Sequence, residues 1–256
     1  MKTEDIEYHA DGARLVGYLA VDDTRAGKRP GVLVAPEGGG LVDLTKSIAR
    51  RLAEAGYAAF AMDYYGDGKP LTDRNEVMPR INAFMAEPST IRARAAAAQA
   101  VLSGQPQTDP ERLAAIGYCF GGTTVLELAR SGADLKAVVG FHSGLGTTRP
   151  QDAQAIRAKV LTCIGALDPI IPPEQRLAFE KEMTEGGVDW RMNVYGGAGH
   201  SFTNPNAGRW ACRGSTTTPR RTGGPGRPCR TCSTRPWVRS RPTPSCARLA
   251  GFVYGG

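Results

Sequence analysis

The sequence predicts an α/β fold in which one mostly parallel, doubly wound sheet is flanked by helices. Short, wholly apolar segments such as residues 31–35 (GVLVA) are typical of strands buried on both faces of a parallel sheet. These segments alternate with segments whose apolar residues recur at helical spacing, as they do when helices connect parallel strands. The 256 residues are 41% hydrophobic, which is enough to bury one sizeable core.

The first part of the chain is expected to begin with an antiparallel hairpin around Asp11-Gly12, a dipeptide that favours a tight turn. A helix should follow the strand at 31–35, because apolar residues recur there every three or four positions and Gly56 can end the helix. The elements expected here are strands at 6–9, 14–20, 31–35 and 58–62 and a helix over 44–55.

The alternation of strands and helices continues after residue 62. An alanine-rich helix is expected to run from a cap at Ser89 or Thr90 to about Ser103 and to end at Gly104. In a doubly wound sheet, ligands bind beyond the carboxyl ends of the strands, so catalytic side chains are expected there. The later elements are strands at 113–118, 137–141, 160–164 and 189–195 and helices at 123–129 and 173–185.

The segment GYCFGG (residues 117–122) joins an expected strand to an expected helix. A sharp turn at such a junction raises its central side chain above the sheet, and it requires small residues such as Gly117 and Gly121 on either side. The central residue is Cys119, and the N-terminus of the following helix favours a thiolate there. A buried structural cysteine beside a glycine turn is the alternative, but the placement between strand and helix favours a nucleophile.

A nucleophile in such a turn requires an acid and then a base later in the chain, each in a loop after a strand. Asp168 follows the strand at 160–164 and is the expected acid, although alone it would be an ordinary turn residue. His200 lies in the glycine-rich loop after the last strand and is the expected base. His142 also follows a strand and could reach the site, but it precedes Asp168 in the chain.

The loop PEGGG (residues 36–40) follows the strand at 31–35. In this position a hydrolase supplies one of two backbone N–H groups that stabilise an oxyanion, and the residue after the nucleophile supplies the other. The amides of Gly38 and Phe120 are therefore the candidates. A phosphate-binding loop is excluded because no Gly-Lys-Ser/Thr follows. Glu37, taken alone, would be a solvated loop carboxylate.

Together these features resemble the dienelactone hydrolases of the α/β-hydrolase superfamily, over about residues 10–206. The matching segments are APEGGG (35–40), AGYAAFAMDYYGDG (55–68), GYCFGG (117–122), GALDP (165–169) and GAGHSF (197–202). The resemblance implies an α/β-hydrolase fold and a triad of Cys119, Asp168 and His200. It implies that Glu37 interacts with the resting thiol and helps to deprotonate it. It also implies hydrolysis of a small ester or lactone through a thioester, without a cofactor or metal.

The sequence departs from the family in the expected substrate pocket. Family members that act on carboxylated lactones carry an arginine shortly after HSF, whereas this sequence has Thr-Asn-Pro at 203–205. Arg80 could match a second carboxylate-binding arginine of the family, and we expect it to line the pocket with His142 and Phe202. The reaction class is therefore better indicated than the substrate.

Residues 209–256 differ in composition from residues 1–208, which we expect to form the catalytic domain. They contain ten arginines and no lysine, aspartate or glutamate, and without them the net charge falls from +7 to −3. A basic disordered tail that binds nucleic acid would explain this composition, and so would a zinc module, although one C-x-x-C at 229–232 lacks paired ligand spacing. The mixture of Arg, Pro, Gly, Ser, Thr and Cys favours out-of-frame translation, so no nucleic-acid partner is expected.

The sequence also indicates where the protein acts. The start MKTEDIEYHA lacks the apolar segment of a signal peptide, and no stretch approaches the ~18 apolar residues of a membrane span. Cys119 and Cys163 lie far apart and are expected to be reduced thiols. We therefore expect a cytoplasmic enzyme without a membrane partner, whose oligomeric state the sequence does not indicate. A catalytically weakened binding protein with the same fold is the alternative class.

Overall fold

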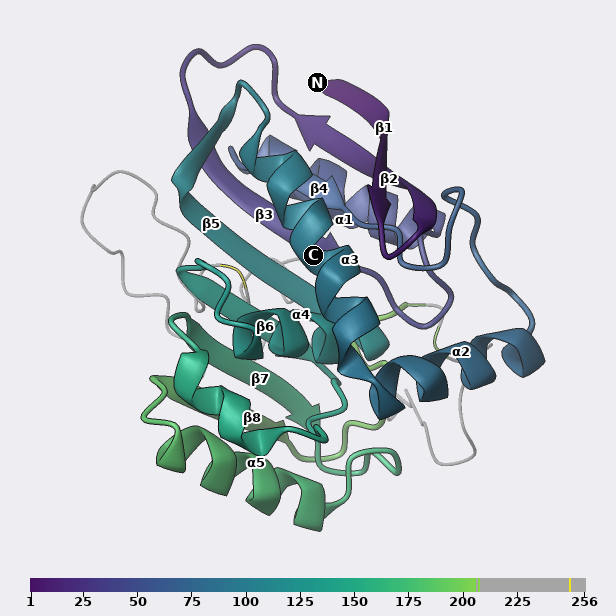
Figure 1. The fold of residues 1–256 in the computed structure, drawn as a ribbon, viewed down its shortest axis with the longest axis vertical. Helices are drawn as coiled ribbons and strands as arrows, with labels where there is room; N and C mark the ends of the chain where they lie inside the picture. The colour runs from purple at the N-terminus through teal and green to yellow at the C-terminus, as the bar shows by residue number, and fades with distance from the viewer. Residues whose placement is uncertain (206, 208–248, 250–256) are drawn as a thin grey trace, which may run out of the picture.

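A single sheet runs through the part of the chain that the computed structural model describes, which is residues 1–205, Ala207 and Leu249 (Figure 1). Its strands are β1 (Lys2–Ala10), β2 (Ala13–Val21), β3 (Arg29–Ala35), β4 (Ala58–Ala61), β5 (Thr108–Tyr118), β6 (Ala137–Phe141), β7 (Lys159–Gly165) and β8 (Trp190–Tyr195). The helices are α1 (Asp43–Glu54), α2 (Arg74–Ala86), α3 (Pro88–Ser103), α4 (Phe120–Arg130) and α5 (Pro173–Glu185), and η1 (Pro150–Ala155) is a 3₁₀ helix.

The topology of the sheet is that of an α/β-hydrolase. The strand order is β1-β2-β4-β3-β5-β6-β7-β8. Strands β1 and β2 form an antiparallel hairpin, and β2 also pairs antiparallel with β4. All the other neighbouring strands run parallel. The predicted doubly wound, mostly parallel sheet is thus confirmed. The carboxyl ends of β3, β5, β7 and β8 reach one edge of the sheet, which is where the predicted site residues follow.

Both faces of the sheet are covered, because alternate residues of each buried strand point to opposite sides. On β3, Leu33 and Ala35 belong to a core that includes side chains of α3, α4 and α5. Val32 and Val34 belong to a second core, on the side of α1. In Figure 1, α3 crosses in front of the sheet. The apolar runs predicted from the sequence are buried for this reason.

Two features around α2 and α3 differ from the prediction. The sequence does not predict α2, because Pro79 lies inside it and proline disfavours a helix interior. The cap of α3 is Glu87 rather than Ser89 or Thr90, and its side chain accepts a hydrogen bond of 3.3 Å from the Ser89 N–H. Pro88 explains the earlier start, since proline at the first helical position has the required φ and needs no acceptor.

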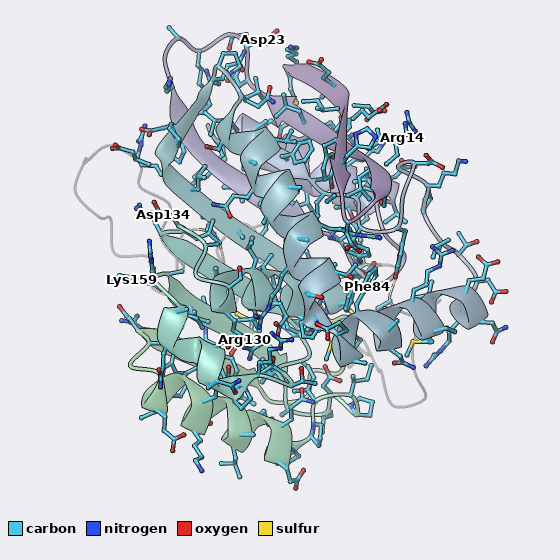
Figure 2. The ribbon with its side chains drawn as sticks, in the orientation of Figure 1. Arg14, Asp23, Phe84, Arg130, Asp134 and Lys159 are labelled. Carbon is cyan, nitrogen blue, oxygen red and sulfur yellow. The ribbon has the colours of Figure 1, made fainter. Side chains whose placement is uncertain are left out.

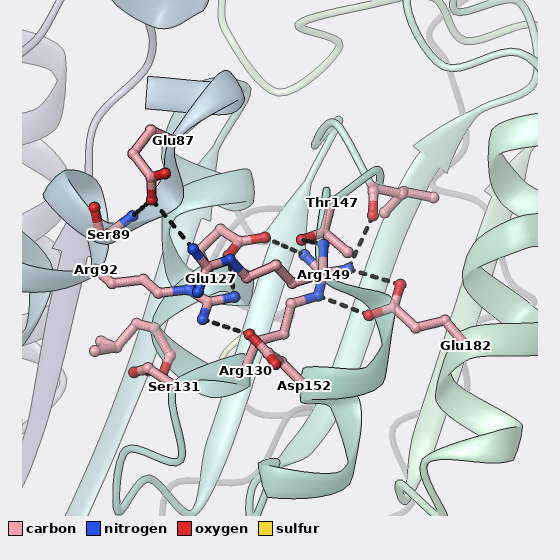
Figure 3. Close-up of polar contacts among 12 residues, drawn as sticks. Glu87, Ser89, Arg92, Glu127, Arg130, Ser131, Thr147, Arg149, Asp152 and Glu182 are labelled. Carbon is pink, nitrogen blue, oxygen red and sulfur yellow. Dashed lines mark hydrogen bonds and ion pairs between the residues drawn. The ribbon is translucent and has the colours of Figure 1, made fainter. Parts of the chain in front are cut away.

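A network of buried charges ties α4 to the elements around it (Figure 3). The Arg130 side chain is fully buried, and its Nε and Nη2 donate to the two carboxylate oxygens of Glu182 on α5, at 2.7 and 2.9 Å. Its Nη1 donates to Glu127 at 2.9 Å. Arg92 on α3 joins Glu127 at 2.8 Å to Asp152 on η1 at 2.6 Å. Figure 2 shows Arg130 between the helices, whereas Arg14, Asp23, Asp134 and Lys159 lie at the periphery.

Most of the tail lies outside the described residues, so the boundary predicted at residue 208 stays a prediction. The one described residue beyond it is Leu249, which is helical, fully buried and part of the core on the α1 side. At that position the chain is part of the core, which the prediction did not include. Among the described residues, none of the helices has the length and apolar character needed to cross a membrane.

Candidate active site

A sharp turn forms at the junction of β5 and α4, with Cys119 as its central residue. Cys119 has φ 53° and ψ −119°, a conformation that side-chain-bearing residues rarely adopt and that is typical of strained functional turns. The chain approaches itself closely on either side, because a Cβ atom on Gly117 would lie 2.1 Å from the Gly121 carbonyl oxygen. A Cβ atom on Gly121 would lie 2.2 Å from the carbonyl oxygen of Ala35, at the end of β3. Only glycine fits at these two positions.

The three residues predicted to form the triad lie next to one another, although they come from three separate loops. The distance between Cys119 Sγ and His200 Nε2 is 3.1 Å, and that between His200 Nδ1 and Asp168 Oδ2 is 2.8 Å. The other carboxylate oxygen of Asp168 accepts from the Ile170 N–H at 2.9 Å, which fixes its orientation. The result is a hydrogen-bonded chain from carboxylate to imidazole to thiol.

The electrostatic surroundings favour a positive charge on His200. Burial lowers the pKa of this imidazole, but the hydrogen bonds with Asp168 and Cys119 outweigh burial and raise it to about 10. Asp168 is buried as well, and its Oδ2 lies 2.8 Å from Nδ1 of the ring. A charged imidazole beside the sulfur stabilises a thiolate, which is the nucleophilic form of cysteine.

Hydrogen bonds to two carbonyl oxygens hold the loop after β3. The Glu37 carbonyl oxygen accepts from the Gly40 N–H at 2.9 Å and from the hydroxyl of Tyr64. The Tyr64 hydroxyl also lies 2.8 Å from the Pro36 carbonyl oxygen. Because the Glu37–Gly38 peptide is trans and planar, the Gly38 N–H points away from these contacts.

A second tyrosine fixes the next peptide, since the Tyr65 hydroxyl donates to the Gly38 carbonyl oxygen at 2.7 Å. The other predicted oxyanion donor, the Phe120 N–H, begins α4, where backbone N–H groups have no acceptor within the helix. In the described part of the chain, neither the Gly38 nor the Phe120 amide meets an acceptor. Sequence reasoning missed the role of the two tyrosines, although AMDYYGDG was one of the matching segments.

Glu37 is placed differently from what the resemblance implies. Its Oε2 accepts a hydrogen bond of 2.7 Å from Asn204 Nδ2, and its Oε1 lies 3.9 Å from His142 Nε2. The Cys119 thiol pairs with His200 instead. Burial raises the pKa of the Glu37 carboxyl. Asn204, which follows HSF where some family members have an arginine, thus holds Glu37 in this structure.

The three residues predicted to line the pocket occupy different environments. His142 is fully buried, and its ring makes edge-to-face contacts with His200 at 5.2 Å and with Phe202 at 5.4 Å between centroids. Phe202 also packs against Tyr195 on β8. These two residues therefore support the histidine loop from the interior. Arg80 is exposed on α2, with its guanidinium 5.8 Å from the Tyr65 ring centroid, at the margin of the site.

An apolar wall beside the predicted oxyanion donors comes from α2 and α4. The Phe84 ring stacks on the Phe120 ring at 5.9 Å and lies 6.3 Å from the Tyr65 ring, all measured between centroids. A Cβ atom on Gly38 would lie 3.0 Å from Ile81 Cδ1, so α2 also packs on the oxyanion loop. The sequence could not indicate this wall, because it does not predict α2. Across the residues that the structure describes, no group of three or more His, Cys, Asp or Glu could hold a metal ion.

Known proteins share both this fold and this sequence pattern. The sequence profile of the dienelactone hydrolase family matches residues 15–216. A solved structure named m3DLH is 46% identical, with a TM-score of 0.82 over 85% of this chain and 91% of its own. A dienelactone hydrolase-like promiscuous phosphotriesterase from metagenomic libraries is 40% identical, with a TM-score of 0.79 over 84% of this chain and 90% of its own.

A curated relative from Yersinia pestis, named a carboxymethylenebutenolidase, is 28% identical over 204 residues. The match spans 75% of this chain and 76% of the relative. The family profile covers well over half of the chain and includes the nucleophile turn, the acid loop and the histidine loop. The chain therefore belongs to the dienelactone hydrolase family.

Proposed function

We propose that this chain hydrolyses small ester or lactone bonds through a thioester on Cys119. The observation that carries the proposal is the chain of contacts from Asp168 through His200 to Cys119, with distances of 2.8 and 3.1 Å. A base that is oriented by a carboxylate and bonded to the nucleophile is the arrangement required for nucleophilic catalysis. The amides of Gly38 and Phe120, which meet no acceptor in the described part of the chain, would hold the oxyanion.

The reaction would proceed in two halves. The Cys119 thiolate attacks the carbonyl carbon, and the oxyanion accepts hydrogen bonds from the Gly38 and Phe120 amides. The C–O bond breaks as His200 gives its proton to the departing alkoxide, which leaves a thioester. His200 then takes a proton from water, and the resulting hydroxide displaces the sulfur to release the acid. Asp168 keeps the imidazole oriented and stabilises its charged form throughout.

The thioester is the intermediate that tests this proposal directly. Acid quenching during turnover of a chromogenic ester is expected to reveal a protein mass increased by one acyl group. Hydroxylamine should remove the group, because it cleaves thioesters, and the modified peptide should be the one that contains Cys119. An acyl group on a residue other than Cys119 would contradict the mechanism. So would turnover without any acyl adduct in a variant whose second step, hydrolysis of the thioester, is slowed.

The charge of the preferred substrate follows from the residues around Glu37. Asn204 carries no charge and holds Glu37, while Arg80 is exposed at the margin of the site. A neutral ester should therefore be hydrolysed with a higher kcat/KM than a matched ester that carries a carboxylate. A tenfold preference for the anion, about 1.4 kcal/mol, would show that a cation has taken over substrate binding. Arg80→Met is the control, because it should then abolish that preference.

Phosphotriester hydrolysis is a second candidate function. The observation that favours it is the structure with 40% identity, whose name describes a promiscuous phosphotriesterase. The thiolate would attack phosphorus instead of carbon and expel the alkoxide, which takes the proton of His200, while the same two amides stabilise charge on the phosphoryl oxygen. Water, deprotonated by His200, would then break the S–P bond and restore the thiolate. Both reactions depend on Cys119, so the same Cys119 variants test both.

A further inference from the structure

We propose that His142 is a positioning residue, which holds the nucleophile and the general base in place relative to each other. The inference rests on the proposed function of Cys119. His142 is the residue after β6 and is fully buried. Its φ is 41°, in the left-handed region that residues with a side chain rarely adopt. Its N–H donates to the Cys163 carbonyl oxygen at 2.8 Å, which helps to fix this conformation.

One nitrogen of the His142 ring contacts the nucleophile turn. The Cys119 N–H lies 3.1 Å from His142 Nδ1 and shares its hydrogen with the Phe141 carbonyl oxygen at 2.9 Å. A backbone N–H can only donate, so Nδ1 must accept and carries no proton. The ring therefore ties the backbone of the nucleophile to the end of β6.

The other nitrogen contacts the loop of the general base. In the neutral tautomer with Nδ1 as acceptor, the proton lies on Nε2. Nε2 is 2.8 Å from the hydroxyl oxygen of Thr203, three residues after His200, and can donate to it. The His200 ring also packs edge-to-face with the His142 ring, with 5.2 Å between centroids and 69° between planes. A single ring thus spans the two loops that supply Cys119 and His200.

The groups around His142 keep it neutral. The ring lies beside His200, Cys119 and Tyr118 and close to Glu37, whose Oε1 is 3.9 Å from Nε2. Burial, and then the charge on His200, lower the pKa of His142 well below its ordinary value. A proton on Nδ1 would remove the acceptor for the Cys119 N–H. Because the ring stays neutral, His200 can gain and lose its proton without breaking this contact.

The bridge formed by His142 affects the contact of 3.1 Å between Cys119 Sγ and His200 Nε2. This contact depends on two loops that the sequence separates by 81 positions and that His142 bridges. Loss of the bridge should weaken the imidazole–thiol pair even though both residues remain. The effect should appear in the reactivity of the thiol as well as in the turnover of substrate.

Three variants separate the two contacts. His142→Leu removes both, and Thr203→Val removes only the acceptor of Nε2. His142→Asn keeps an acceptor near the position of Nδ1, and asparagine tolerates a left-handed φ. We expect kcat to fall about 10- to 100-fold in His142→Leu, since small misplacement of reacting groups has effects of this size. Thr203→Val should have a smaller effect and His142→Asn the smallest, with KM little changed in all three.

The measurement that a merely structural role would not change is the rate of alkylation of Cys119 in the folded protein at neutral pH. Iodoacetamide labelling is followed on the peptide that contains Cys119, in variants whose circular dichroism matches that of the wild type. In His142→Leu, the rate constant of alkylation should fall toward that of His200→Ala, because a thiol separated from its imidazole is less often in the reactive thiolate form. His200→Ala serves as the reference for complete loss of the pair, and it should reduce activity more than any His142 variant.

Two results would overturn the proposal. One is a folded His142→Leu protein with an unchanged kcat and an unchanged rate of Cys119 alkylation. The other is a loss of activity in all His142 variants, His142→Asn included, that is proportional to the loss of folded protein. Failure of the proposed function can be distinguished from failure of the role of His142. If the proposed function is wrong, ester turnover survives in Cys119→Ala, whatever the alkylation rates of the His142 variants show.

Discussion

Cys119→Ala is expected to lower kcat/KM for a chromogenic ester by about 10⁴-fold or more, as the loss of the nucleophile does in other triad enzymes. The physical reason is that the 3.1 Å contact with His200 activates only this thiol. Binding should be little affected, because alanine leaves the oxyanion amides and the apolar wall of α2 in place. The measurement is steady-state hydrolysis of a neutral p-nitrophenyl ester, with melting temperature and circular dichroism as checks on folding.

Cys163→Ala is the matched control. Cys163 is the other described cysteine, and it lies buried on β7 with its sulfur 3.9 Å from the Tyr195 hydroxyl oxygen. Its replacement should lower stability slightly and leave the activity of the folded protein unchanged. Cys119→Ser should retain only traces of activity, because the site is arranged around a larger and more acidic nucleophile. Ester turnover at the wild-type rate in Cys119→Ala would reject the nucleophile, and the same variants decide the phosphotriester reaction.

The parts of the site that the sequence predicts are those specified by neighbouring residues. The glycines at 117 and 121 flank Cys119 along the chain, so the local pattern already contains the steric requirement of the turn. Asp168 and His200 follow apolar strands directly, and a parallel sheet brings the carboxyl ends of such strands to one edge. For the same reason the strands and most of the helices lie where the apolar periodicity predicts them.

The remaining features depend on contacts between distant segments. Tyr64 and Tyr65 orient the oxyanion loop across 27 positions of sequence, and His142 meets Thr203 across 61. No local pattern distinguishes such tyrosines from core residues, and the sequence predicts His142 only as a residue of the pocket. The pairing of Glu37 with Asn204, across 167 positions, is likewise a product of tertiary structure. The helix α2 forms despite Pro79, since tertiary packing outweighs local propensity there.

The second large effect concerns stability. Arg130→Met is expected to lower the free energy of unfolding by about 3–5 kcal/mol, the usual cost of removing one partner of a buried ion pair. The guanidinium makes two hydrogen bonds to Glu182 and one to Glu127 and donates to the Leu145 carbonyl oxygen at 3.0 Å (Figure 3). Methionine fills much of the same volume, so the loss of stability would arise mainly from the uncompensated carboxylate of Glu182. Urea denaturation of the wild type and of Arg130→Met measures the difference in unfolding free energy.

Arg149→Met is the matched control, because Arg149 pairs with Glu87 on the surface, at 3.4 Å and with both side chains exposed. Exposed pairs contribute only about 0–1 kcal/mol, so this variant should unfold close to the wild type. If Arg130→Met cost no more than Arg149→Met, the buried network would not hold α4 in place. Removing the stranded charge as well, in Arg130→Met with Glu182→Leu, should recover part of the stability, since an apolar pair avoids the desolvation of the carboxylate.

The loss in Arg130→Met should also depend on pH, and the sign follows from Glu182. Burial raises the pKa of this carboxyl even though the hydrogen bonds of Arg130 lower it, and without Arg130 the pKa would rise further. A carboxyl whose pKa is higher in the folded state binds a proton more readily there, so acid favours the folded variant over its unfolded chain. The difference from the wild type should therefore be larger at pH 8 than at pH 5. An equal loss at both values would place the defect in packing rather than in the buried charge.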